Sequence, residues 1–372
     1  MATTKRVIST LPYASSIYFG CDPELFITKD VGKVRKRVAV VGSERVIPEH
    51  GLTHREHHGS IVRDGVQVEL HPLQSYCREV LRYRLHGMFQ ALDTHIKQSQ
   101  YAGMKINFSQ VVKVSRGDLM RLSPDARQLG CQPSLNVYGR TPIQKNGETY
   151  QLRSAAGHVH IGCEWVRNGH IKPGRLVHIL DVLVGNTCVL LDRDPLAAER
   201  RKVYGLAGEY RLPIHGLEYR TLSNFWLRSY PLMSLVMGLT KMAVKVAQAN
   251  RARSVTDPPS SDGPVAYDAE ERLMASVDLE MVEKAINTNN LDLAALTFES
   301  AVRPFLMSIR SDEGLDHRSL VNFDHFVKKG LDHWFPGDPL KNWLLEAKQK
   351  GWESYLSSVV DTDRQHDKKG RV

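Results

Sequence analysis

A short segment near the middle of the chain alternates strictly between polar and apolar side chains. Within Ser154–Cys163, His158 and His160 share one parity, whereas Val159 and Ile161 share the other. Successive side chains of a β-strand point to opposite faces, so a period of two predicts a strand with one buried apolar face and two imidazoles side by side on the other. Two imidazoles are costly to bring together unless they bind a metal ion, a proton or an anion.

Three further segments have the same design. Each of them alone is typical of an ordinary half-buried strand. Their polar faces, however, carry carboxylates, imidazole and arginine instead of the lysines, serines and threonines of a solvated face. If all four strands lie in one antiparallel sheet, these groups cluster on one side of it. The polar residues are Asp22 and Glu24 in Ile17–Ile27, then Gln67, Glu69 and His71 in Gly65–His71, then Glu218 and Arg220 in Gly216–Arg220.

Such a cluster of carboxylates repels itself unless divalent cations neutralise it. Oxygen-rich ligation with one or two nitrogens suits Mg²⁺ or Mn²⁺ better than structural zinc, which prefers cysteine and histidine. Mg²⁺ held by carboxylates commonly takes its remaining ligands from water and substrate phosphates. The four strands therefore indicate nucleotide chemistry.

A basic segment lies just before the fourth strand. Arg200–Arg211 contains three arginines and two glycines. Arginine matches phosphate oxygens with two parallel hydrogen bonds, and glycine lets the backbone approach a ligand closely. The chain has neither a P-loop nor a glycine-rich Rossmann turn, so a bound nucleotide requires another kind of site. Without the neighbouring strand, the same segment would be typical of a basic surface loop.

The remaining pattern predicts strands and helices together, that is, an α+β chain. Apolar residues at three- and four-residue steps predict helices over Arg78–Lys97, Arg175–Leu191 and Pro231–Ala249. Residues 12–250 then form the main domain. They are followed by a loop or linker rich in Asp, Pro, Ser and Gly over 251–267, a mainly helical extension over 268–360 and a disordered polar tail over 361–372. Helix starts are predicted at Asp278, Asn290 and Asp316.

The formal charge of +9 fits either a solvated basic surface or attraction to an anionic ligand. No basic stretch has the length and aromatic interleaving that would favour nucleic acid. The five cysteines are odd in number and form no Cys-x-x-Cys, which favours reduced thiols in a cytoplasmic protein. The most apolar run, Leu232–Thr240, is too short to span a bilayer, so no membrane partner is expected.

Taken together, these segments resemble the phage-type carboxylate–amine ligases (amidoligases of type 2) of the glutamine synthetase and glutamate–cysteine ligase superfamily. The matching segments occur in the order of that family and span roughly Gly20 to Trp226, which leaves the helical extension outside the resemblance. The segments are Gly20–Phe26, Asp64–Glu69, Leu129–Asn136, Gly157–Gly162, Asp192–Asp194, Arg200–Arg211 and Gly216–Trp226.

The resemblance implies a curved antiparallel sheet, a funnel or partial barrel like the glutamine synthetase catalytic domain, backed by helices and with the active site on its concave face. It also implies a ligase that uses ATP and Mg²⁺ or Mn²⁺. Such an enzyme converts a carboxylate into an acyl phosphate, which an amine then attacks to give an amide, ADP and phosphate. A phage-encoded enzyme of this kind would act in the host cytoplasm.

By matching motif positions, the resemblance also implies a role for individual residues. Arg220 would neutralise the transferred phosphoryl group and, with Arg201 and Arg211, bind the nucleotide phosphates. His160 would contact a substrate carboxylate or the acyl phosphate, and Asp64 would accept a proton from the attacking ammonium. The implied metal ligands are Glu24, Glu69, His158 and Glu218, with Asp22 as a further one.

Two other functions stay open at this point. One is a zinc hydrolase that uses His158 and His160 as paired ligands. The other is a basic binding or assembly module without activity. The sequence does not name the carboxylate or the amine, which small molecules, peptides or polymers could each supply, and it leaves the oligomeric state open.

Overall fold

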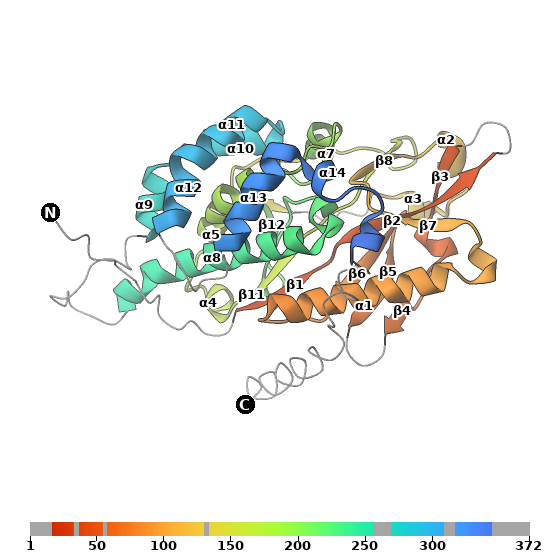
Figure 1. The fold of residues 1–372 in the computed structure, drawn as a ribbon, viewed down its shortest axis with the longest axis horizontal. Coiled ribbons are helices and arrows are strands. Elements are labelled where there is room, and N and C mark those ends of the chain that lie inside the picture. Colours follow the sequence, from red (N-terminus) through yellow and green to blue (C-terminus); the bar gives the residue numbers. More distant parts are fainter. Residues whose placement is uncertain are drawn as a thin grey trace.

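The computed structural model describes residues 17–32, 37–54, 58–129, 134–255, 269–308 and 317–343. Within them the chain is α+β, and its antiparallel strands curl into a half-barrel with helices packed behind them (Figure 1). This arrangement confirms the predicted class, a curved antiparallel sheet backed by helices.

Most of the strands lie in two sheets, and every pair is antiparallel. The five-stranded sheet has the order β1 (Tyr18–Cys21), β11 (Val159–Gly162), β13 (Gly216–Tyr219), β12 (Glu209–Arg211) and β9 (Leu135–Asn136). The six-stranded sheet has the order β3 (Arg37–Val41), β2 (Glu24–Val31), β6 (Gln67–Pro72), β5 (Gly59–Asp64) and β4 (Leu52–His54), and β7 (Met104–Asn107) also pairs with β2. A separate pair consists of β8 (Val111–Lys113) and β10 (Leu152–Ser154).

The segment Ile17–Ile27, predicted as one strand, forms two. β1 pairs with β11 in one sheet, and β2 pairs with β6 in the other. Pro23 lies at the break, because proline has no N–H to donate to a ladder, and its carbonyl accepts a hydrogen bond from Leu70 N at 3.0 Å. Glu24 then donates its N–H to the Ala156 carbonyl at 2.9 Å. The four predicted strands therefore occupy two adjoining sheets rather than one, with Asp22 at the junction.

The three predicted helices are confirmed. α1 (Arg78–Ile96) packs against β5, β6 and α8 (Tyr230–Val255). The second predicted helix, Arg175–Leu191, runs as α5 (Pro173–Leu180), the π-helical turn η3 (Asp181–Gly185) and α6 (Asn186–Val189), and α8 is the third. The shorter helices of this part are η1 (Ser43–Arg45), η2 (Ser99–Tyr101), α2 (Arg116–Leu119), α3 (Pro124–Arg127), α4 (Glu164–Arg167), α7 (Ala197–Val203) and η4 (Asn224–Arg228).

The described residues of the C-terminal part, 269–308 and 317–343, are mainly helical. The helices α9 (Ala269–Ala275), α10 (Leu279–Asn287), α11 (Leu291–Thr297), η5 (Phe298–Val302), α12 (Arg303–Ser308) and α13 (His317–Lys329) gather at the end of the molecule away from β3 and β7, and α14 (Leu331–Trp334) follows them (Figure 1). Asp278 caps α10 by accepting from Glu280 N at 2.9 Å, and Asn290 caps α11 by accepting from Leu293 N at 3.0 Å. α13 begins directly after Asp316, which lies outside the described residues.

These helices share one core with the sheets. Val282, Ile286 and Val302 are buried in the same apolar cluster as Val159 and Ile161 of β11. At its C-terminal end α8 continues to Val255, so the first residues of the predicted linker 251–267 are helical. Residues 256–268 and the predicted tail 361–372 lie outside the described part of the chain.

Four of the five cysteines lie among the described residues, and all four are free thiols, as predicted. Cys21, Cys163 and Cys188 are buried, and Cys131 lies outside the described residues. None of the helices in the described ranges is both long and apolar enough to cross a membrane.

One buried carboxyl makes stability depend on pH. Asp181 lies in η3, where its Oδ1 accepts a hydrogen bond from Tyr219 Oη at 2.6 Å, and burial raises the pKa of Asp181 to about 7. The unfolded chain loses this proton near pH 4. As pH rises from 4 to above 7, Asp181 therefore lowers the free energy of unfolding, by about 4 kcal/mol in total.

Asp181→Asn keeps an oxygen for Tyr219 without the charge. We expect the variant to melt at a higher temperature than the wild type at pH 8 and to differ little at pH 4. Calorimetric melting curves between these two pH values measure the difference. Asp30→Asn, at an exposed pair with Lys105, is the control. If the melting temperature of Asp181→Asn depended on pH as steeply as that of the wild type, Asp181 would not be the source of the pH dependence.

Candidate functional site

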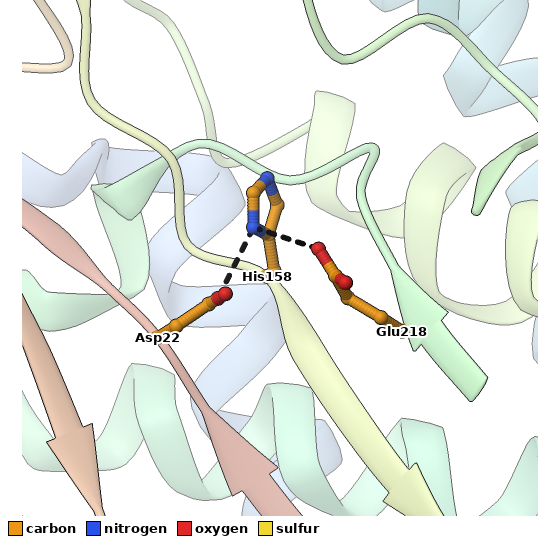
Figure 2. A group of neighbouring side chains, drawn as sticks. All are labelled: Asp22, His158 and Glu218. Atoms are coloured by element: carbon orange, nitrogen blue, oxygen red, sulfur yellow. Dashed lines mark ion pairs between the residues drawn. The ribbon is translucent and has the colours of Figure 1, made fainter. Parts of the chain in front are cut away.

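Asp22, His158 and Glu218 meet beside three neighbouring strands of the five-stranded sheet. Asp22 follows β1, His158 precedes β11 and Glu218 lies on β13, so three neighbouring strands supply one residue each. His158 Nδ1 lies 3.1 Å from Asp22 Oδ1 and 3.4 Å from Glu218 Oε1 (Figure 2). One ligand atom from each residue falls within 4.8 Å of the others, which is the spacing of a metal-binding group. We call these three residues the His158 group.

The state of His158 fits a metal ligand. Burial lowers the pKa of His158, so the ring is neutral at neutral pH. Tyr204 Oη lies 2.5 Å from Nε2, and a ring that donates its Nε2 proton there keeps a lone pair on Nδ1. His158 Nδ1 and Asp22 Oδ1 are buried and have no hydrogen-bond partner among the described residues, although they are neighbours. A lone pair that faces two carboxylates calls for a cation between them.

His160 has a different environment from His158. Its Nε2 lies 3.0 Å from Asp22 Oδ2, and its Nδ1 lies 3.1 Å from Nε2 of His215, whose ring stacks on it. Burial opposes protonation, but Asp22 outweighs it and raises the pKa of His160. Burial likewise opposes ionisation of Asp22, but His158 and His160 hold its pKa well below the usual value. The two histidines therefore contact the same carboxylate from two sides and are not equivalent.

The other two predicted ligands, Glu24 and Glu69, lie in a second acidic group with Asp64. Glu24 on β2 and Glu69 on β6 are directly opposite in the antiparallel register. Burial raises the pKa of Glu24 well above its usual value, and Asp64 and Glu69 raise it further. Burial and the charge of Glu69 raise the pKa of Asp64 to about 7. The five predicted ligands thus form two neighbouring groups rather than one.

The Glu24 carboxylate is held at one oxygen. Ala156 N donates to Glu24 Oε2 at 2.8 Å, and Gln67 Nε2 approaches the same oxygen at 3.4 Å. His71, which shares the parity of Glu69, places its Nε2 2.8 Å from Glu69 Oε2. The contact with Glu69 outweighs burial and raises the pKa of His71. These contacts hold the carboxylates of the second group in place.

The arginines of the predicted phosphate-binding set have different environments. Arg220 is buried, and its Nη1 pairs with Glu218 Oε1, while Arg211 Nη1 lies 3.7 Å from Glu218 Oε2. Arg201, in contrast, is turned inward from α7 and donates to the carbonyls of Gly205 at 2.5 Å and Thr221 at 2.6 Å. In this structure Arg201 binds backbone, and only Arg211 and Arg220 border the His158 group.

Three residues near the site were not singled out from the sequence. Tyr204 contacts His158 and accepts a hydrogen bond from Arg220 Nη2 at 3.3 Å. His215 lies in the loop between β12 and β13, where no periodic pattern marks it. Glu209 shares a parity with Arg211 on β12, and this was the signal that could have found it.

A cavity of about 550 Å³ adjoins the second acidic group. Glu24, Asp64, Tyr204 and Glu209 line it, and residues of the segments 128–129 and 134–154 supply much of the remaining wall. Tyr204 thus contacts His158 and the cavity at once. The site as a whole can hold divalent cations, neutralise phosphates through Arg211 and Arg220, and accept an organic molecule beside them.

Residues 144–316 match the family model described as Phage phiEco32-like COOH.NH2 ligase-type 2. The match confirms the resemblance drawn from the sequence motifs. It contains the segments of His158, Glu218 and Arg220, but it begins after Asp22 and Asp64. It also continues beyond Trp226 through α9–α12, so the resemblance was wrongly limited to the residues before the helical extension. A search of curated proteins gives no match.

Proposed function

Residues 144–316 belong to the phage-type carboxylate–amine ligases, and from this premise we propose that the protein is an ATP-dependent ligase that forms an amide through an acyl phosphate. The observation that carries the proposal is the His158 group, whose three ligand atoms lie within 4.8 Å of one another beside Arg220. Divalent cations and an arginine at one place are the usual requirements of phosphoryl transfer. We also propose that the half-barrel corresponds to the catalytic domain of the glutamine synthetase superfamily.

The proposed reaction has two steps. A carboxylate oxygen of the first substrate attacks the γ-phosphorus of ATP, the bond from that phosphorus to the bridging oxygen breaks, and ADP leaves. The amine nitrogen of the second substrate, after losing a proton, then attacks the carbonyl carbon of the acyl phosphate. The C–O bond to the phosphoryl group breaks, and amide and inorganic phosphate leave. The net products are amide, ADP, phosphate and one proton.

Asp22, His158 and Glu218 would hold one divalent cation, and Glu24 and Glu69 would contribute to a second. Mg²⁺ or Mn²⁺ bound there would offset the charge of the triphosphate. Arg220, fixed between Glu218 and Tyr204, would contact the transferred phosphoryl group.

Other residues of the site would act on the nucleotide and on the two substrates. Arg211, which is less buried than Arg220, would bind the outer phosphates of the nucleotide. Arg201 would support that region through its backbone contacts. His160, with its raised pKa, would donate to the substrate carboxylate or to the acyl phosphate. Asp64, with a pKa of about 7, has the proton affinity of a general base at neutral pH and would take the proton from the amine.

We propose that the enzyme acts in the cytoplasm, which is that of the host if a phage encodes it. The free thiols among the described residues support this location.

The acyl phosphate is tested by isotope transfer. The protein is incubated with ATP, Mg²⁺ and a panel of carboxylates labelled with ¹⁸O, each combined with a panel of amines. The proposal expects ADP rather than AMP, and one ¹⁸O atom per turnover in the released phosphate. AMP formation, or unlabelled phosphate alongside amide, would contradict it. Elemental analysis of the purified protein tests the zinc hydrolase: stoichiometric tightly bound zinc, with no ATP-dependent amide, would support that alternative.

Replacing His158 and replacing His160 are expected to impair the enzyme in different ways. His158→Ala should raise the Mn²⁺ concentration required for half-maximal activity by at least about 10–100-fold, because a ligand is lost. His160→Ala should raise the KM for the carboxylate and leave the Mn²⁺ requirement unchanged. Steady-state titrations of metal and carboxylate measure both effects, with circular dichroism as the check on folding. Identical defects in the two variants would contradict the separate roles.

A further inference from the structure

The cavity beside the second acidic group has a wall that suits a cation. Glu24, Asp64 and Glu209 all line it. Of the basic residues in its wall, Arg153 is buried and donates its guanidinium protons to the carbonyls of the surrounding segment, including those of Arg127 at 2.9 Å and Gly147 at 2.6 Å. Lys145 is exposed. Among the described residues of the wall, the carboxylates therefore outnumber the basic side chains that could pair with them.

Glu209 is the residue that points to a ligand. Its side chain is 1% exposed, and Gly205 N donates to Oε2 at 2.8 Å. The other oxygen, Oε1, is buried and has no hydrogen-bond partner among the described residues. A buried carboxylate oxygen without a donor is costly, and a primary ammonium carries three donors together with the opposite charge.

The cavity is much larger than ammonia. Ammonia is about as large as water, which occupies about 30 Å³ in the liquid, whereas the cavity measures about 550 Å³. Its wall includes apolar side chains such as Pro142, Leu152 and Val203. Residues 143–146 are exposed, whereas Glu24 and Glu209 are buried, so the carboxylates lie at the inner end. Carboxylates at the inner end and apolar side chains along the wall fit a molecule with a cationic end and a carbon chain.

We propose that this cavity binds the amine substrate, and that this substrate is a primary ammonium on an extended carbon chain rather than ammonia. The inference rests on the proposed ligase function. Tyr204 lines the cavity and contacts His158, so an amine held there lies next to the place where the acyl phosphate would form.

Calorimetric titration of the full chain at pH 8, without nucleotide, tests the inference directly. The probes are hexylamine, hexanol, hexanoate and ammonium chloride. We expect hexylamine to bind at least tenfold more tightly than each of the other three. Glu209→Gln, which can still accept from Gly205 N, should lose at least tenfold in hexylamine affinity. Glu164→Gln, at an exposed position on α4, is the matched control and should bind like the wild type.

Equal affinity for hexylamine and hexanol, unchanged affinity in Glu209→Gln, or competition between hexylamine and ATP for one site would each overturn the inference. The ligase proposal and the cavity assignment can be rejected independently of each other. If hexylamine binds as expected but no carboxylate–amine pair supports ADP release, the cavity assignment stands and the ligase proposal falls. If ATP-dependent amide formation proceeds with ammonia as well as with long amines, the ligase proposal stands and the cavity assignment falls.

Discussion

Arg220→Lys is expected to lower the rate of ADP formation by about 10³-fold, the lower end of the effect of arginines that contact a transferred phosphoryl group. Lysine keeps the positive charge, so Glu218 is not left buried without a partner. It loses the planar guanidinium, whose Nη1 pairs with Glu218 and whose Nη2 donates to Tyr204. Rapid-quench measurement of the first turnover reports the phosphoryl step by itself.

The control for this variant is Arg228→Lys, at an ion pair with Asp332 outside the site. Both substitutions shorten an arginine that pairs with a carboxylate, but only one of them touches the site. We expect Arg228→Lys to keep wild-type rates. If Arg220→Lys retained more than a tenth of the wild-type rate, Arg220 would not be the residue that neutralises the phosphoryl group.

Glu218→Gln is expected to weaken Mn²⁺ binding by more than about 100-fold and to lower activity by at least the same factor. Removing a group that only orients a metal ligand already costs up to about 100-fold, and here the ligand itself is lost. Glu218 is central because it borders His158 Nδ1 at 3.4 Å and contacts Arg220 and Arg211 as well. Glutamine has the same shape but lacks the charge that would hold the cation. Electron paramagnetic resonance of Mn²⁺ measures binding without turnover.

Glu283→Gln is the matched control, because Glu283 is also a buried glutamate paired with an arginine, Arg140, at 2.5 Å. It lies on α10, outside both acidic groups. We expect its Mn²⁺ affinity to equal that of the wild type. Equal losses in the two variants would mean that the effect comes from disturbed packing, and the His158 group would then lose its role as the metal site.

The alternating strands were predictable because a strand has a period of two whatever its surroundings. Val159 and Ile161 are buried and His158 and His160 lie on the other side, as the parity required. The helix starts at Asp278 and Asn290 were predictable for a similarly local reason, since a side-chain oxygen caps the first turn. Local chemistry decides such features, and the sequence displays it.

The division of the acidic residues into two groups was not predictable from parity. Asp22 and Glu24 share a parity, but the ladder breaks at Pro23, so they lie in different groups. Arg201 was expected at the nucleotide phosphates because its motif position in the family resemblance implies that role. Its direction depends on α7, whose geometry turns it towards the carbonyls of Gly205 and Thr221.

Tyr204, His215 and Glu209 show a further limit. Tyr204 and His215 lie near the site because of tertiary contacts, Tyr204 with His158 and His215 with His160. Glu209 instead accepts from Gly205, only four residues away in the chain. Contacts between distant residues leave no periodic trace in a single sequence. Only Glu209 carries a local signal, its shared parity with Arg211, and one weak signal does not single out a residue.

The family match and the folding unit have different boundaries. The matched segment 144–316 contains β11, whose ladder partner β1 comes from Tyr18–Cys21, and β10, whose partner is β8 (Val111–Lys113). A polypeptide cut to the matched segment would lose these partners and also β9 (Leu135–Asn136), the partner of β12. It would therefore expose three unpaired strand edges, and open edges of this kind promote aggregation. The segment by which sequence similarity recognises this protein is thus not one that could be excised as a soluble, self-sufficient fragment.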